Sequence, residues 1–201
     1  MPIEIEKKYR LTQKQRRAIE QRMRELSITP SELEFEENTI YRGGRLDFGG
    51  CALRLRRVNG RAYLTFKRRL PTKSAIKHQE EEEVTVGNPD AMDAILQSLH
   101  FYPALVYEKR RTRWDVHKTK VVLDELPFGL FMEIEAPVRA IKRVEKILGA
   151  DSLPAVMETY PRLTFKFGKK RNGIVEARFK PSVRARSVTR ARSGGRASDT
   201  A

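Results

Sequence analysis

Two glutamates and a lysine alternate near the start of the chain, in the stretch Glu4-Ile5-Glu6-Lys7-Lys8. Successive side chains of a β-strand point to opposite faces, so Glu4, Glu6 and Lys8 would share one face. Paired carboxylates are hard oxygen ligands of the kind that Mg²⁺ and Mn²⁺ prefer, and a lysine is a compact positive charge for phosphate. An exposed edge strand would carry the same residues, so the interpretation depends on whether other strands repeat the pattern.

The pattern recurs in alternating segments at residues 52–57, 62–67, 81–86, 107–116, 120–125 and 131–136. Each segment places apolar side chains on one face and charged side chains on the other. A solvated sheet face permits such salt bridges, but it usually mixes Thr, Ser, Gln and Lys. A face made almost entirely of ions therefore favours a charged cavity. Its acids are Glu4, Glu6, Glu81, Glu83, Asp124, Glu133 and Glu135, and its bases are Lys8, Arg54, Arg56, Lys67, Lys109, Arg111 and Arg113.

A cavity that contains both charges suits a complex of a polyphosphate with a metal ion. The acids would neutralise the metal, while arginines fork onto phosphate oxygens and lysines add point charges. Phosphoryl transfer depends mainly on positioning and charge stabilisation, and metals also lower the pKa of bound water. The sequence contains no GxxxxGK[ST] motif, so we expect no P-loop.

Three helices are predicted to lie beside these strands, at residues 12–26, 88–99 and 138–148. Thr12 and Gln15 resemble a capping box, Pro89 marks a helix start, and Gly149 marks a helix end. An Asn-Gly pair in residues 58–61 predicts a hairpin. Residues 30–38 have the composition of a polar connection, and residues 150–167 are ambiguous between a short helix and a strand. Neighbouring strand pairs favour an antiparallel sheet or barrel whose apolar face the helices cover.

Composition restricts the class of protein. The single cysteine, Cys51, excludes an internal disulfide and a cysteine metal cluster. We see no secretory signal and no apolar run long enough for a membrane span, which requires roughly 18 residues, so we expect a cytoplasmic protein without membrane contact.

The net charge of +15 is uneven along the chain, because residues 168–201 hold ten Lys and Arg against two acids. This arginine- and serine-rich segment is predicted to be a disordered tail behind a folded domain at residues 1–167. The tail is either a contact for nucleic acid and other polyanions or a solubilising extension.

The chain resembles the CYTH superfamily, the triphosphate tunnel metalloenzymes. The resemblance rests on the Glu-x-Glu-x-Lys signature at residues 4–8, and on ENTIY at 37–41, ALRLRR at 52–57, LTFK at 64–67, the acidic strand at 81–86, KRRTRW at 109–114, LDELPFG at 123–129 and MEIEA at 132–136. It covers roughly residues 1 to 165. It implies an α+β fold, in which an eight-stranded antiparallel β-barrel encloses a tunnel and helices flank its outer face.

The resemblance also implies roles for the charged residues. The metal ligands for Mg²⁺ or Mn²⁺ would be Glu4, Glu6, Glu133 and Glu135, with Asp124 as a further ligand. The triphosphate cradle would be Lys8, Arg54, Arg56, Lys67, Arg111 and Arg113, with Lys109 less firmly matched. Among these, Lys8, Arg54, Arg56 and Lys67 would act in catalysis. Glu81 and Glu83 would hold a second metal or orient bases, and Tyr41 is left without a role.

Members of this family hydrolyse inorganic, thiamine, nucleoside or RNA triphosphates, or are class IV adenylyl cyclases that convert ATP to cyclic AMP and pyrophosphate. We favour hydrolysis, because triphosphate alone accounts for the ionic face and no purine pocket is evident. A protein that binds polyphosphate or nucleic acid without catalysis is the other alternative. Its inward carboxylates would repel polyanions unless metal were present. The oligomeric state is left open.

Overall fold

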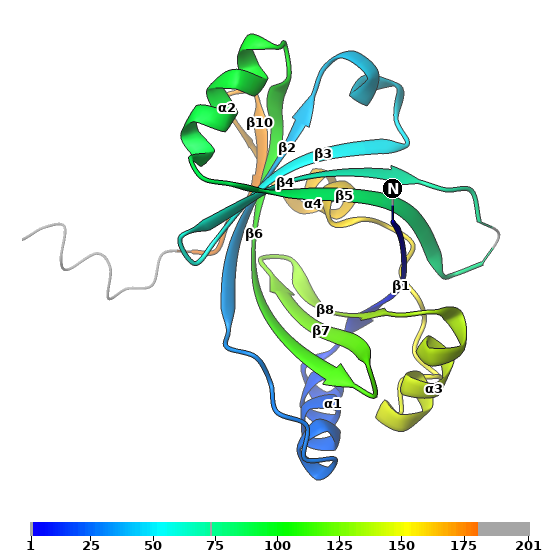
Figure 1. Cartoon of the computed structure of the whole chain (residues 1–201). Helices are drawn as coiled ribbons and strands as arrows, with labels where there is room; N and C mark the ends of the chain where they lie inside the picture. The colour runs from blue at the N-terminus through cyan, green and yellow to red at the C-terminus, as the bar shows by residue number, and fades with distance from the viewer. Residues whose placement is uncertain (1, 73, 181–201) are drawn as a thin grey trace, which may run out of the picture.

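A computed structural model describes residues 2–72 and 74–180. In these residues the chain forms ten β-strands, four α-helices and one short 3₁₀ helix (Figure 1). The strands are β1 (Ile3–Leu11), β2 (Glu34–Arg42), β3 (Cys51–Val58), β4 (Arg61–Arg69), β5 (Lys77–Val86), β6 (Tyr102–Val116), β7 (Thr119–Leu126), β8 (Gly129–Glu135), β9 (Lys169–Arg171) and β10 (Ile174–Ala177). The helices are α1 (Gln13–Glu25), η1 (Gly44–Phe48), α2 (Pro89–Ser98), α3 (Val138–Leu148) and α4 (Tyr160–Phe167).

Eight of these strands form a closed antiparallel barrel. Their order is β2-β3-β4-β5-β1-β8-β7-β6, and β6 pairs with β2 to close the ring. β10 adds to β6 in parallel at residues 105–107, next to the part of β6 that pairs with β7 at residues 110–116. The predicted α+β fold with an eight-stranded antiparallel barrel and flanking helices is therefore confirmed.

Local signals in the sequence fix the turns and the helix ends. Asn59 and Gly60 both have positive φ, 47° and 75°, as a tight two-residue hairpin between β3 and β4 requires. Thr12 caps α1 by accepting a hydrogen bond from the backbone N–H of Gln15, in the predicted capping box. Gly149 adopts the left-handed conformation, with φ 65°, and ends α3.

Apolar side chains leave the barrel outward and pack beneath the helices. One cluster lies under α1 and α3, which sit together against the barrel in Figure 1, and a second lies under α2. Lys7 also points outward and pairs with Glu145 of α3 at 2.5 Å, opposite to its neighbours Glu6 and Lys8. The ionic face is thereby left inside the barrel. No helix in the described residues has the length and apolar character that a membrane-spanning helix needs.

The predicted connection at residues 30–38 is wrong in its second half, because β2 begins at Glu34. Pro30 and the run of acids indicated a loop, yet the alternation of Glu34, Glu36 and Asn38 is that of a strand with a polar inner face. The ambiguous segment 150–167 contains a helix, α4, which Thr159 caps. It packs its buried Tyr160 and Leu163 against β6 and β10.

The predicted start of the tail at residue 168 is also wrong. Residues 169–177 form the β9–β10 hairpin, in which Val175 and Ala177 pack into the core. Arg178 donates hydrogen bonds to Glu37 and Glu108 and so ties the end of β10 to β2 and β6. The rest of the predicted tail, residues 181–201, lies outside the described residues.

Candidate active site: a charged cavity in the barrel

The barrel encloses a cavity of about 990 Å³. Of the predicted site residues, only Asp124 does not line it. The predicted residues on its wall are Glu4, Glu6, Lys8, Arg54, Arg56, Lys67, Glu81, Glu83, Lys109, Arg111, Arg113, Glu133 and Glu135. They come from six strands, β1, β3, β4, β5, β6 and β8. The charged faces of six separate sequence segments therefore line the same cavity.

Three carboxylates form an acidic cluster, which we define as Glu4, Glu6 and Glu135. One oxygen of each lies within 4.8 Å of the others. The cluster follows from strand register, because Glu6 of β1 lies directly opposite Glu135 of β8 and Glu4 precedes it on the same face. An all-carboxylate donor set at this separation is the chemistry that suits Mg²⁺ or Mn²⁺.

Each carboxylate of the acidic cluster has its own lysine. The Nζ of Lys67 lies 2.7 Å from Glu4 Oε2, and the Nζ of Lys120 lies 2.6 Å from Glu135 Oε2. The third lysine, Lys77, is almost fully buried and lies 2.9 Å from Glu6 Oε1. Lys67 and Lys120 line the cavity, whereas Lys77 stands behind it.

Proton affinities in and around the cluster are strongly perturbed. Burial raises the pKa of Glu135, and the carboxylate of Glu4 adds to this. Burial and a hydrogen bond with Glu4 raise the pKa of Glu81 to about 7. Burial alone would also raise the pKa of Glu4, but its hydrogen bond with Glu81 and the charge of Lys67 lower it to about 2. Glu81 and Glu135 therefore resist ionisation, and a bound cation would favour their charged forms, which supports the fit to a metal.

The arginines on β3 have unfilled hydrogen-bonding capacity. The Nε atoms of Arg54 and Arg56 are buried and have no hydrogen-bond partner among the described residues. Arg54 donates from Nη2 to Thr65 Oγ1 at 3.2 Å, and Arg56 donates to both oxygens of Glu83 at 3.0 Å. Buried donors normally find a partner. Two such donors on the cavity wall therefore indicate a place for an anion.

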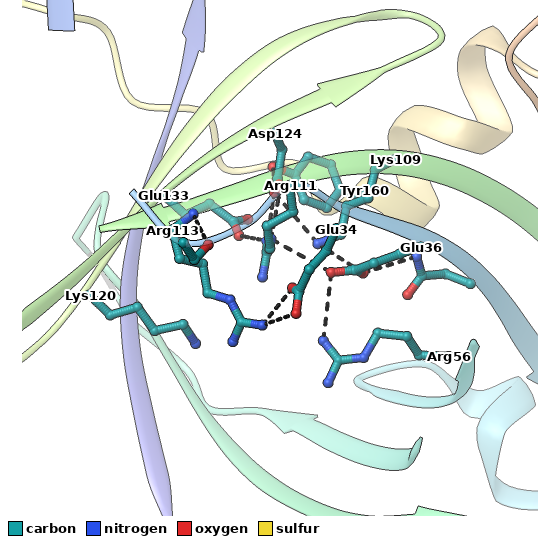
Figure 2. A network of polar contacts seen from close by, with 12 residues as sticks. Glu34, Glu36, Arg56, Lys109, Arg111, Arg113, Lys120, Asp124, Glu133 and Tyr160 are labelled. Carbon is teal, nitrogen blue, oxygen red and sulfur yellow. Dashed lines mark hydrogen bonds and ion pairs between the residues drawn. The ribbon is translucent and has the colours of Figure 1, made fainter. Parts of the chain in front are cut away.

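β2 contributes two acids that the sequence interpretation missed. Glu36 is fully buried, and its carboxylate lies 3.3 Å from the Nζ of Lys109 and 3.8 Å from Arg56 (Figure 2). Burial would raise its pKa, but the charges of Lys109 and Arg111 hold the pKa at about 2. Glu34 takes hydrogen bonds from Arg113 at 2.5 Å. The two-residue spacing of these acids indicates a strand with both side chains on one face. It was overlooked because the segment was interpreted as a connection.

Asp124 lies behind the cavity wall, away from the acidic cluster. Its two oxygens accept hydrogen bonds from Arg111 at 2.7 and 2.6 Å, and Tyr160 donates to the second at 2.8 Å (Figure 2). Glu133 is bound by Arg111 at 2.8 Å and by Lys8 at 3.1 Å. Of the five predicted metal ligands, the structure brings three together, and it places these two among cations.

α4 contributes the ring of Tyr160 to the cavity wall, which the sequence did not indicate. The Nζ of Lys8 lies 3.7 Å from the centre of the Tyr160 ring, and the Nζ of Lys109 lies 5.6 Å from it. This buried ring therefore holds two cradle lysines by cation–π contact. Tyr41, which the sequence left without a role, points outward and donates a hydrogen bond to Asp93 of α2 at 2.5 Å.

A model of the CYTH domain family matches residues 2–151. The chain belongs to this family. No curated protein matches it. Among solved structures, the CYTH chain is similar to the PH1819 protein from Pyrococcus horikoshii OT3, with 27% identity, a TM-score of 0.67, and coverage of 81% of this chain and 98% of that one.

Two further neighbours of this CYTH chain carry functional descriptions. One is HpAC1 from Hippeastrum, a candidate adenylyl cyclase described as having a dominant triphosphatase activity. It shows 22% identity, a TM-score of 0.63, and coverage of 84% of this chain and 98% of that one. The other is a candidate adenylate cyclase from Vibrio parahaemolyticus, with 20% identity, a TM-score of 0.61, and coverage of 80% and 97%. At these identities the two neighbours support the fold of this chain and not a particular activity.

Proposed function

We propose that this CYTH protein hydrolyses a triphosphate inside the barrel with the help of Mg²⁺ or Mn²⁺. The observation that carries the proposal is the presence, in one cavity, of the acidic cluster on β1 and β8 and, on the other side of the barrel, of the Nε donors of Arg54 and Arg56, which have no partner among the described residues. A metal needs the first and a phosphate chain needs the second. Cations without carboxylates would fit any anion, whereas both together fit a metal-complexed polyphosphate.

The roles divide between two groups of side chains. Glu4, Glu6 and Glu135 would hold the cation, which when bound supplies neutralising charge for the phosphate oxygens. Arg54 and Arg56 would grip those oxygens from β3. Because their flanking acids fix both arginines in place before substrate arrives, positive charge is already aimed at the site where negative charge develops.

The rest of the predicted cradle consists of Lys8, Lys67, Lys109, Arg111 and Arg113, which surround the same space. Glu81 and Glu83 would orient Lys67 and Arg56, with which they form ion pairs at 2.8 and 3.0 Å. Asp124 would act through Arg111, whose guanidinium it holds by two hydrogen bonds. Water attack on a terminal phosphorus would break a bridging P–O bond and release orthophosphate.

Hydrolysis is preferred over cyclisation of ATP. The ionic wall is accounted for by three phosphates and a cation, and a related fold, HpAC1, is described as having dominant triphosphatase activity. The cyclase reaction is the second candidate, since the same fold carries that designation in Vibrio parahaemolyticus. The two reactions differ in products, orthophosphate on one side and cyclic AMP with pyrophosphate on the other.

The deciding experiment is a panel of inorganic triphosphate, thiamine triphosphate and nucleoside triphosphates, each with Mg²⁺ or Mn²⁺. Orthophosphate and cyclic AMP are measured in the same reactions. We expect metal-dependent orthophosphate release, lost in Arg56→Ala and kept in Arg143→Ala, an exposed residue of α3. Cyclic AMP as the main product from ATP would establish the cyclase, and binding without any product would establish a non-catalytic polyanion-binding protein.

A further inference from the structure

A basic and aromatic surface runs along α4 and onto β9. On α4, Arg162, Phe165 and Lys166 share one exposed face, at spacings of three and four residues. Phe165 is 63% exposed, which is unusual for a large aromatic side chain. All three side chains of β9 are exposed and basic. We call this surface the α4–β9 strip and define it as Arg162, Phe165, Lys166, Lys169, Lys170 and Arg171.

The α4–β9 strip carries uncompensated positive charge. The sequence has no acid from Thr159 to Val175. None of the five cations of the strip forms an ion pair with any described residue, and each is exposed. Other surface arginines, such as Arg57 with Asp90 at 2.7 Å, do form ion pairs. The strip is therefore free to meet a polyanion without breaking internal pairs.

The strip is continuous with the cavity. Arg162 and Phe165 line the cavity wall, and at most about 14 Å of extended chain separates Phe165 from Lys169. A Cβ added at Gly168 would lie 2.6 Å from the carbonyl oxygen of Thr164 and 2.8 Å from that of Glu176. Only glycine lets the β9–β10 hairpin approach the end of α4 this closely, so the two halves of the strip lie next to each other.

We propose that the α4–β9 strip binds single-stranded nucleic acid. The cations match the regular backbone phosphates, and the exposed ring of Phe165 is a platform on which an unpaired base can stack. A duplex hides its base faces and would use only the charges. Exposed Arg139, Lys142 and Arg143 on α3 offer a similar charge, but α3 has no aromatic residue and none of the three lines the cavity.

The test uses the full chain and a fluorescent single-stranded oligonucleotide that ends in a 5′-hydroxyl, measured by anisotropy over a range of salt concentrations. The strip variant is K169E/K170E/R171E, and the control of equal charge change is R139E/K142E/R143E. Because the oligonucleotide carries no triphosphate, the result does not depend on the proposed reaction of the cavity. Thermal unfolding checks that both variants are folded.

We expect the strip variant to bind at least about tenfold more weakly than the control, with a shallower dependence of log K on log salt, by about 0.7 per lost phosphate contact. Phe165→Ala should weaken single-strand binding on the order of tenfold and leave the salt dependence unchanged. It should not affect duplex binding. Equal weakening in both triple variants, or unchanged binding in Phe165→Ala, would overturn the proposal. Tighter binding to anionic lipid vesicles than to the oligonucleotide, lost only in the strip variant, would assign the strip to a membrane surface instead.

Discussion

The Nζ of Lys120 lies 2.6 Å from Oε2 of Glu135, across the antiparallel pair of β7 and β8. The other two carboxylates of the acidic cluster also have one lysine each, from β4 and β5. The cluster that would hold a divalent cation is thus already neutralised by the chain itself. In the proposed function a metal would compete with these lysines, and Lys67 and Lys120, which line the cavity, would then be available to phosphates.

Replacing Lys120 should therefore separate metal affinity from substrate affinity. We expect Lys120→Met to bind Mn²⁺ more tightly, by up to about fivefold, because a partly exposed ion pair of about 1 kcal/mol no longer competes. The same variant should bind inorganic triphosphate more weakly. Titration calorimetry measures both affinities, and Lys142→Met on α3 is the matched control. Weaker Mn²⁺ binding in Lys120→Met would show that this lysine holds the ligand in place and does not compete with the metal.

Removing a carboxylate of the acidic cluster should abolish turnover and leave the fold intact. Glu4→Gln keeps the size of the side chain and removes the charge that a cation needs. We expect no detectable activity, no Mn²⁺ binding and a thermal unfolding temperature close to that of the unchanged chain. Excess chelator should have the same effect on the unchanged chain. Full activity in chelator would end the metal proposal.

Which residues face the cavity could be predicted from the sequence, and their positions along the barrel could not. Alternation by two residues determines the face of a strand, so Glu4, Glu6 and Arg54 were placed correctly. Position along the barrel depends on register between strands, which no single segment encodes. Asp124 was therefore expected beside the acidic cluster, although register and Tyr160 place it beneath Arg111.

Three residues that contact the predicted site residues, Glu36, Lys77 and Tyr160, were missed because the local sequence around each does not clearly indicate a strand or a helix. Glu36 lies on a strand whose acidic composition resembles a loop, and Tyr160 starts a helix of only eight residues. Lys77 lies at the first position of β5, one residue beyond a loop. In each case a tertiary contact decides the local structure. Burial against an opposite charge or against the cavity wall outweighs a weak intrinsic preference for strand or helix.

Truncation should locate the true end of the folded domain. Removal of residues after Lys180 should leave the thermal unfolding temperature and the proposed triphosphatase activity within error of the full chain. Removal after Gly168 deletes β9 and β10, including buried Ala177 and the Arg178 hydrogen bonds. A loss of about 3 kcal/mol would lower the unfolding temperature by roughly 6–12 °C in a chain of this size. Equal stability of the two truncated chains would contradict the placement of the hairpin.

The low pKa of Glu36 should make the barrel sensitive to acid. Its folded-state pKa of about 2 lies below the ordinary value of 4.5, so its ionised form stabilises the fold above pH 4.5. That contribution is lost as the pH falls from 4.5 towards 2, and it is on the order of 3 kcal/mol. Glu36→Gln should be less stable at pH 7 and should lose less stability on acidification than the unchanged chain.

Urea unfolding at pH 7 and pH 3 measures this difference. Glu32→Gln changes an exposed acid of the neighbouring segment and serves as the control. The control should follow the unchanged chain at both pH values. If Glu36→Gln also has the same free energy of unfolding as the unchanged chain at both pH values, the charges around Glu36 do not contribute to stability in the way the structure indicates.

Replacing Arg54 should show whether the charged residues of the cavity bind substrate or only form structural ion pairs. Its Nε has no partner among the described residues, and its Nη2 donates to Thr65 Oγ1 and lies 3.6 Å from Glu83 Oε2. If the free donor meets a phosphate whose charge grows in the transition state, Arg54→Ala should lower kcat as well as raise KM. A lost charge-assisted hydrogen bond of about 1.5–3 kcal/mol corresponds to roughly ten- to a hundredfold in rate.

Stability should respond only weakly. Burial disfavours the charged form of Arg54, but the charges of Glu36, Glu81 and Glu83 attract it and raise its pKa. Its charge repels Lys67, and Thr65 keeps its own hydrogen bond to Glu83 at 2.7 Å when Arg54 is removed. The unfolding temperature of Arg54→Ala should therefore be unchanged or slightly lower. Steady-state kinetics and thermal unfolding are measured on the same sample, with Arg143→Ala as the exposed control. Unaltered kinetics combined with a markedly lower unfolding temperature would make Arg54 a structural ion and would remove it from the cradle.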